Sequence, residues 1–177
     1  MMTPRAAIAA GEIWLRPFGH FLPEHQGYMG FSSETVRDDF LAAMRDGALV
    51  LIWTRQVRGE ARWKGYCRGL LQLAKVPVMA ASQSSAHGNA QRLGSDRDFS
   101  FAVKAVRAWE MDDSHKVLMR NVAPSIWPGQ TQVIGHRSGR MSPAELPNLE
   151  NLRVREVSVF GQPAVVSSVF EEVRKVF

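Results

Sequence analysis

The pattern of apolar and polar residues predicts about six short β-strands between residues 12 and 160. The expected strands are residues 12–18, 48–54, 66–73, 99–109, 131–134 and 152–160. Several of them alternate apolar and polar side chains, as a strand with one buried face does. Residues 48–54 differ because they are apolar almost throughout, which is typical of a central strand buried on both faces.

The segment 66–73 is expected to pair antiparallel with residues 48–54 and to keep one face in solvent. Its alternation places two sets of side chains on opposite faces: Cys67, Leu71 and Leu73 on one, and Tyr66, Arg68, Leu70 and Gln72 on the other.

Three segments carry helix signals. Ser33 is placed to cap a helix that ends at Gly47 and has an apolar face made by Val36, Phe40, Leu41 and Met44. A second helix begins at Ser142 and is limited to about one turn by Pro147. Residues 163–177 repeat apolar side chains at spacings of three and four, which predicts a strongly amphipathic C-terminal helix.

Two long segments, residues 19–31 and 80–97, are expected to be loops. The first contains proline and glycine, and the second is small, polar and without a period. The prediction is therefore a small α+β domain over residues 1–161, followed by a helix over 162–177 that docks on the sheet, forms a dimer or links to a further domain.

Composition is that of an ordinary globular protein, with 45% apolar and 22% charged residues. No apolar stretch approaches the roughly 20 residues that span a bilayer, and the N-terminal segment lacks the core of a signal peptide. We therefore expect a cytoplasmic protein without a membrane partner. The single cysteine, Cys67, cannot form an internal disulfide and is expected to be a buried core residue.

Motifs for catalysis or cofactor binding are not found in the sequence. The five histidines do not have the spacing of a zinc site, and phosphate-binding glycine motifs and the serine-hydrolase motif are not present. The adjacent pairs Asp38, Asp39 and Asp112, Asp113 diverge on either a helix or a strand. We expect a protein that is not an enzyme and that uses neither a metal nor a cofactor.

Positive charge is concentrated between the two central strands. The chain carries 22 basic and 17 acidic residues, a net charge of +5, and this segment contains one acid, Glu60. We call residues 55–68 the basic loop, and its candidate contacts to phosphate groups are Arg55, Arg58, Arg62, Lys64 and Arg68.

Aromatic residues accompany this charge. Five tryptophans lie at the ends of expected strands or in loops, where indole rings can stack on a planar ligand such as a nucleobase. The ordinary alternative for each ring is core or edge packing. The candidate walls of a base pocket are Trp14, Trp53, Trp63, Tyr66 and Trp109.

Some segments resemble a known family. A helix that ends in glycine, the strand "RDGALVLIWT", a basic loop and the strand "GYCRGLLQL" resemble the core of the PUA-like superfamily, nearest its EVE and YTH type. The later "QVIGHRSGRMSPAEL" and "LRVREVSVFG" are similar to the end of such a domain. The chain departs from the family at Ala48, where an acid is usual, and in the length of residues 80–97.

This resemblance implies a small, bent, mixed β-barrel of about six strands with flanking helices. It also implies a domain that binds nucleic acid, DNA in preference to RNA, and reads a modified base flipped into an aromatic pocket. Such domains resemble the specificity modules of modification-dependent restriction systems, in which a fused or separate nuclease cuts.

A second interpretation of the sequence belongs to another class. The chain would be a non-catalytic protein or small-molecule interaction domain that forms a homodimer through residues 163–177, with the tryptophans in its core. A hydrolase of modified nucleosides is a third interpretation, which rests on fold relatives alone.

Overall fold

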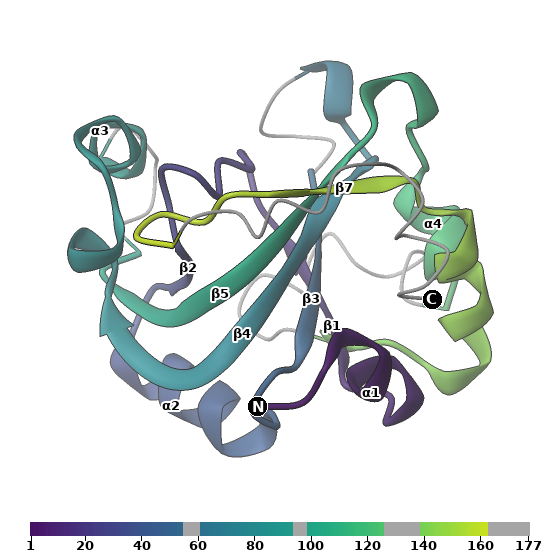
Figure 1. The fold of residues 1–177 in the computed structure, drawn as a ribbon, viewed down its shortest axis with the longest axis horizontal. Coiled ribbons are helices and arrows are strands. Elements are labelled where there is room, and N and C mark those ends of the chain that lie inside the picture. The colour runs from purple at the N-terminus through teal and green to yellow at the C-terminus, as the bar shows by residue number, and fades with distance from the viewer. Residues whose placement is uncertain (55–60, 94–98, 126–138, 163–177) are drawn as a thin grey trace.

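The computed structural model describes residues 1–54, 61–93, 99–125 and 139–162, which form one curled sheet with helices around it (Figure 1). The strands are β1 (Ile13–Pro17), β2 (Tyr28–Phe31), β3 (Leu49–Trp53), β4 (Cys67–Met79), β5 (Phe101–Met111), β6 (Gly139–Arg140) and β7 (Val154–Val157). The α-helices are α1 (Pro4–Ala9), α2 (Glu34–Ala43), α3 (Ala86–Leu93) and α4 (Met119–Val122). Shorter 3-10 helices are η1 (Ala61–Trp63), η2 (Ala80–Gln83), η3 (Asp113–His115) and η5 (Pro143–Asn151).

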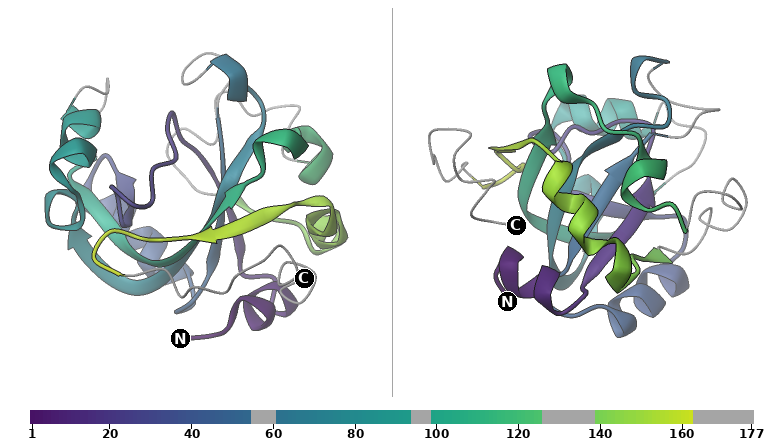
Figure 2. Two further views of the ribbon diagram at one scale, coloured as in Figure 1. Left: turned by 45° about the horizontal axis from the view of Figure 1, so that its top comes forward. Right: turned by 90° about the vertical axis from the view of Figure 1, so that its right-hand side faces the viewer.

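Seven strands of the described chain form the sheet, in the order β2-β5-β4-β3-β1-β6, with β7 also paired to β5. β1 and β3 are parallel, and the other described pairs of these strands are antiparallel. β5 pairs with β4 along one edge, and its other edge is shared by β2 and β7. The register of β4 and β5 shifts where these long strands curve, so the sheet is a half-barrel (Figures 1 and 2). The expectation of a mixed α+β fold with a bent sheet is confirmed at this level.

A buried arginine links β1 to the edge strand at the far end of the curled sheet. Arg16 in β1 donates from Nη2 to the carbonyl oxygen of Gly30 in β2 at 2.9 Å, and its guanidinium lies 4.8 Å from the centroid of the Phe31 ring. The residue is 5% exposed. A charge-assisted hydrogen bond therefore joins β1 to an edge strand with which it does not pair.

Both faces of the sheet are buried under side chains. The α1-face core contains Leu49, Leu51 and Trp53 of β3 together with residues of α1, α4 and η5. The α2-face core contains Val50 and Ile52 together with Phe40, Leu41 and Met44 at α2. Alternate β3 side chains thus enter opposite cores, which confirms the prediction that residues 48–54 form a strand buried on both faces.

The prediction of a solvated face for residues 66–73 is wrong, because β4 is buried from Cys67 to Leu73. Cys67 pairs with Trp53 and Gly69 with Ile52, so Arg68 is an extra residue in this strand. Such a β-bulge exchanges the faces of the residues on either side of it. Cys67 therefore lies in the α1-face core with Leu70, not on the face of Leu71. The antiparallel pairing itself is confirmed.

The two expected loops contain regular structure. Residues 19–31 include β2, and residues 80–93 form η2 and α3. In β2, a Cβ atom at Gly30 would lie 2.6 Å from the Cβ of Phe99, so the strand fits only because this position is glycine. A four-residue strand that contains glycine gives too short a signal to be predicted from its own sequence.

The expected helix starts are confirmed. Ser33 Oγ accepts a hydrogen bond from the backbone N–H of Val36, and α2 ends before Gly47, whose φ is 91°. Ser142 and Glu145 form a capping box at the start of η5, which continues through Pro147 to Asn151 and exceeds the single turn expected. Helix α1 was not predicted.

Several predictions fall outside the described residues: the strand at 131–134, the C-terminal helix over 163–177, and the placement of Arg55 and Arg58. Among the helices that the structure describes, none has the length and apolar character needed to cross a membrane.

Candidate functional site

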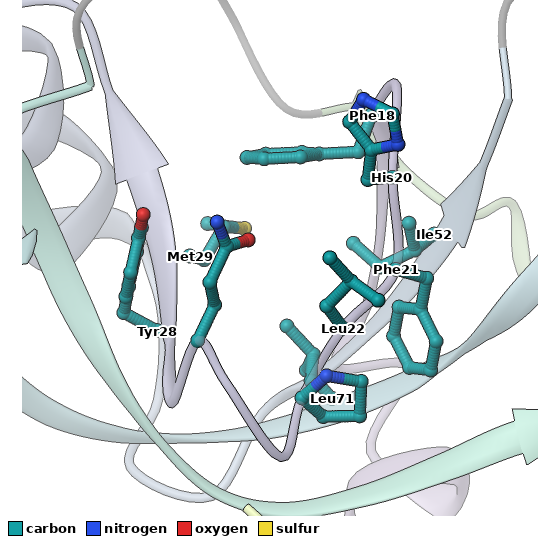
Figure 3. Close-up of a pocket in the computed structure, with 10 residues that line it drawn as sticks. Phe18, His20, Phe21, Leu22, Tyr28, Met29, Ile52 and Leu71 are labelled. Atoms are coloured by element: carbon teal, nitrogen blue, oxygen red, sulfur yellow. The ribbon is translucent and has the colours of Figure 1, made fainter. Parts of the chain in front are cut away.

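An open cleft lies between β2 and the segment that connects β1 to β2 (Figure 3). Its enclosed space is small, about 20 Å³, and the volume reaches about 300 Å³ only when the space open to solvent is included. We call it the aromatic cleft, and the residues that line it are Phe18, His20, Phe21, Leu22, Pro23, Gln26, Tyr28, Met29, Ile52 and Leu71.

The floor of the aromatic cleft belongs to the α2-face core, and its walls come from two segments. Tyr28 and Met29 stand on one side, and residues of the β1–β2 connection stand on the other (Figure 3). Phe21 packs against the backbone of β4, where a Cβ atom at Gly69 would lie 2.6 Å from its ring. The wall therefore depends on a glycine near the start of β4.

Backbone hydrogen bonds hold the β1–β2 connection in place. The N–H of Phe18 donates to the carbonyl of Trp53 at the end of β3, and the N–H groups of His25 and Gln26 both donate to Leu22. Farther along, the N–H of Gly27 donates to Gln83 of η2. The aromatic cleft is thus built on a segment tied to the sheet at one end and to the η2–α3 region at the other.

Gln26 is a polar group among mostly apolar lining residues. Its Nε2 donates to the carbonyl oxygen of Gly88 in α3 at 2.9 Å. Helix α3 approaches closely there, because a Cβ atom at Gly88 would lie 2.2 Å from the carbonyl oxygen of His25. The His25 ring also contacts Ser85 Oγ through Nδ1 at 3.1 Å and the His87 ring, with 4.7 Å between centroids.

The described part of the basic loop lies at the same end of the sheet as the start of the β1–β2 connection. Both begin where β1 and β3 end, and η1 and η3 project there, away from α1 and α2 (Figures 1 and 2). Arg62 and Lys64 are exposed, whereas Arg68 is 5% exposed.

Trp63 anchors this loop between two cations. The Arg68 guanidinium lies 4.5 Å from the centroid of its ring and Lys116 Nζ lies 4.6 Å away. Lys116 also donates to the carbonyl oxygen of Arg62 at 3.3 Å, and Arg62 pairs with Asp113 at 3.2 Å. Arg68 and Lys116 therefore stabilise the loop through Trp63, and among the described residues of the loop Arg62 and Lys64 are exposed to solvent.

The four tryptophans predicted to wall a base pocket do not converge on one slot. Trp53, Trp63 and Trp109 lie in the α1-face core, whereas Trp14 lies in the α2-face core and packs edge-on against Phe40. All four rings are at most 7% exposed. Arginine side chains cover Trp109 and Trp14 in the way that Arg68 covers Trp63. Tyr66 is half-buried against the α1-face core.

The residues that line the aromatic cleft were not among the predicted site residues. They share only the aromatic character of the predicted base pocket. Phe18, Phe21 and Tyr28 lie in or beside the segment expected to be a loop. Three aromatic rings in a segment rich in glycine and proline would have been the signal for them, since an ordinary surface loop contains few large apolar residues.

Reactive groups in the described residues do not form a familiar catalytic or metal-binding arrangement. No three His, Cys, Asp or Glu side chains gather there as a metal site would require. Burial raises the pKa of the Cys67 thiol to about 12, so it is not a nucleophile at neutral pH. Ser114 and Asp112 both contact Nδ1 of His115, whereas a hydrolase triad uses the two ring nitrogens separately.

Comparisons of this chain with protein-family models, with curated proteins and with solved structures find no match. Membership of the PUA-like superfamily therefore stays a prediction from the sequence pattern.

Proposed function

We propose that this chain is a nucleic-acid-binding module of the PUA-like type, which holds a flipped, modified base in the aromatic cleft. The observation that carries the proposal is the position of the cleft: it opens beside the end of β3, and the basic loop begins at that same end. In this proposal the aromatic cleft receives the planar ring, and the cations of the basic loop contact the phosphate groups next to it.

The lining of the cleft suits an extruded base. Aromatic side chains stack on any nucleobase with about 1–3 kcal/mol per base, and no metal or cofactor is needed for binding alone. Phe18 is half-buried and His20 is exposed, so both rings can be reached from solvent. This assignment moves the proposed pocket from the buried tryptophans to the β1–β2 connection.

Charge supports a polyanionic partner. Arg62 and Lys64 are exposed on the basic loop, and Arg120 of α4 is exposed as well. The predicted phosphate contacts at Arg55 and Arg58 remain part of the proposal, whereas the buried position of Arg68 suits an indirect role through Trp63. We propose DNA before RNA, and a nuclease on another domain or partner, because the family resemblance implies both.

A titration tests the proposal directly. Oligonucleotides of one sequence, as DNA and as RNA and with plain, methylated or hydroxymethylated bases, are titrated at two salt concentrations. We expect a preference for one modified form and an affinity that falls steeply with salt. Equal binding of all forms would refute modified-base recognition, and absence of binding at low salt would refute the function as a whole.

A variant pair locates the base. Phe18→Ala should weaken binding of the preferred oligonucleotide by about 5- to 150-fold, the equivalent of one lost stacking contact. Met79→Ala is the control, because Met79 is 50% exposed and does not line the cleft. If free nucleosides bind as tightly as oligonucleotides and without salt dependence, the module binds small molecules instead.

A further inference from the structure

We infer that Gln26 makes the aromatic cleft selective for bases that present an amino group over bases that present a carbonyl group at the same position. This inference rests on the proposed function and adds the chemical class of base to it. Adenine and cytosine belong to the amino class, and guanine, thymine and uracil belong to the keto class.

The orientation of the Gln26 carboxamide follows from its partner. A backbone carbonyl oxygen can only accept a hydrogen bond, so the end of the amide that lies 2.9 Å from the oxygen of Gly88 must be Nε2. Turning the amide over would place two acceptor oxygens against each other.

The anchor is rigid because the backbone on both sides is held. Gln26 forms a β-bridge with Ser84, and its N–H donates to Leu22. Gly88 cannot recede from the β1–β2 connection without breaking the close contact between α3 and the carbonyl of His25. The side chain therefore cannot adapt freely to whichever base is offered.

The carbonyl end of the amide is the part left for a ligand. Within the described residues no hydrogen bond to Oε1 of Gln26 is found, and the residue lines the cleft. An acceptor fixed in this way attracts the N–H of an exocyclic amino group and repels a carbonyl oxygen. A glutamine amide that was free to rotate could form a hydrogen bond with either class of base. The hydrogen bond to Gly88 therefore creates the selectivity.

Two matched pairs of probes test the inference with the unaltered protein. Each probe is a strand of abasic sugar-phosphate units that carries one base: adenine or hypoxanthine, and 5-methylcytosine or thymine. The members of each pair have nearly the same size. They differ in the exocyclic group, amino against keto, and in the ring nitrogen beside it, which accepts a hydrogen bond in the amino member and carries N–H in the keto member. At least in the pair that binds more tightly overall, we expect the amino member to bind about 5- to 150-fold more tightly than the keto member. One well-placed hydrogen bond to a base edge allows a difference of this size.

A variant assigns the effect to Gln26. Gln26→Leu should bind both members of the pair alike, while Gln83→Leu, which removes an amide bonded to Ser82 on the neighbouring η2, should keep the preference. Thermal melting of each variant shows whether it is folded.

The outcomes separate the two proposals. Equal affinity within both pairs, or a preference for the keto member, would overturn the role of Gln26 and leave the proposed function standing. If no probe binds more tightly than the fully abasic strand, stacking in the cleft is refuted, and the inference falls with it.

Discussion

Replacement of Gly88 by alanine tests whether α3 is held by close contact with the β1–β2 connection. Two effects oppose each other in this variant. Alanine in place of glycine inside a helix stabilises it by about 0.8–1.0 kcal/mol through intrinsic propensity alone. Against this, the new Cβ would lie 2.2 Å from the carbonyl oxygen of His25 and 2.9 Å from its carbon.

The steric effect should be the larger one. Both contacts are with backbone atoms, which cannot rotate away, so α3 must move by about 1 Å to reach ordinary van der Waals distance. Overpacking of this kind costs about 1–3 kcal/mol, and loss of the hydrogen bond from Gln26 to Gly88 costs about 0.5–1.5 kcal/mol more. After the gain in propensity, we expect Gly88→Ala to lower the free energy of unfolding by about 1–3 kcal/mol.

Urea denaturation followed by circular dichroism measures this free energy, and hydrogen exchange of α3 amides reports whether the helix separates locally. Ala90→Gly is the matched control, because Ala90 is an exposed residue of the same helix and the change carries only the propensity term. If Gly88→Ala is more stable than the unaltered protein by as much as Ala90→Gly is less stable, the close packing of α3 on the connection is refuted.

Three further predictions concern charged groups. Glu12→Gln should lower the free energy of unfolding by about 1–3 kcal/mol, as measured by urea denaturation. The buried Glu12 carboxylate accepts a hydrogen bond from the indole N–H of Trp14 and pairs with the guanidinium groups of Arg45 and Arg140, so an unchanged free energy of unfolding would contradict that network. Replacing Arg62 and Lys64 together by serine should reduce the slope of log K against log salt by about 2 in oligonucleotide titrations, and an unchanged slope would show that neither contacts phosphate. Hydrogen bonds from the backbone N–H and the hydroxyl of Ser114 lower the pKa of Asp112. The contribution of Asp112 to stability is therefore present above the ordinary carboxyl pKa and is lost as the pH falls through the lowered pKa. An ordinary pKa for Asp112 in an NMR titration would contradict these hydrogen bonds.

The strands with strong local signals were predictable. Residues 48–54 are apolar at almost every position because both faces of β3 are buried, and Ser33 marks the start of α2 because it caps that helix through its side chain. Each of these features depends on residues that are neighbours in the sequence.

Features that depend on distant residues were not predictable in the same way. The bulge at Arg68 moves Cys67 to the opposite face, and no periodicity announces a single extra residue. Likewise, α3 is short and polar, and its place is set by contacts between Gly88 and a segment some 60 positions earlier.

The candidate site also depends on residues that are distant in the sequence, so it was not predictable in detail. Tryptophans at strand ends look available in the sequence, yet Trp63 is covered by Arg68 from the next strand and by Lys116, which lies 53 positions along the chain. The aromatic cleft needs β2, β3, β4 and the β1–β2 connection together. The sequence indicates the chemistry, aromatic rings beside cations, but not which rings remain open.

The shared outer edge of β5 has a consequence for the order of folding. β1, α2 and β3 can assemble early during synthesis, because β1 and β3 pair with each other and both precede β4 and β5 in the chain. β2, in contrast, has its described strand partner only in residues 101–104, so it must wait for β5 while β3 and β4 are already made. Pairings between residues so far apart in sequence are slow to form. The wall of the aromatic cleft that carries Tyr28 and Met29 therefore forms late. Mutations that slow the addition of β5 to the sheet would delay the ability to bind ligand more than they delay compaction of the chain.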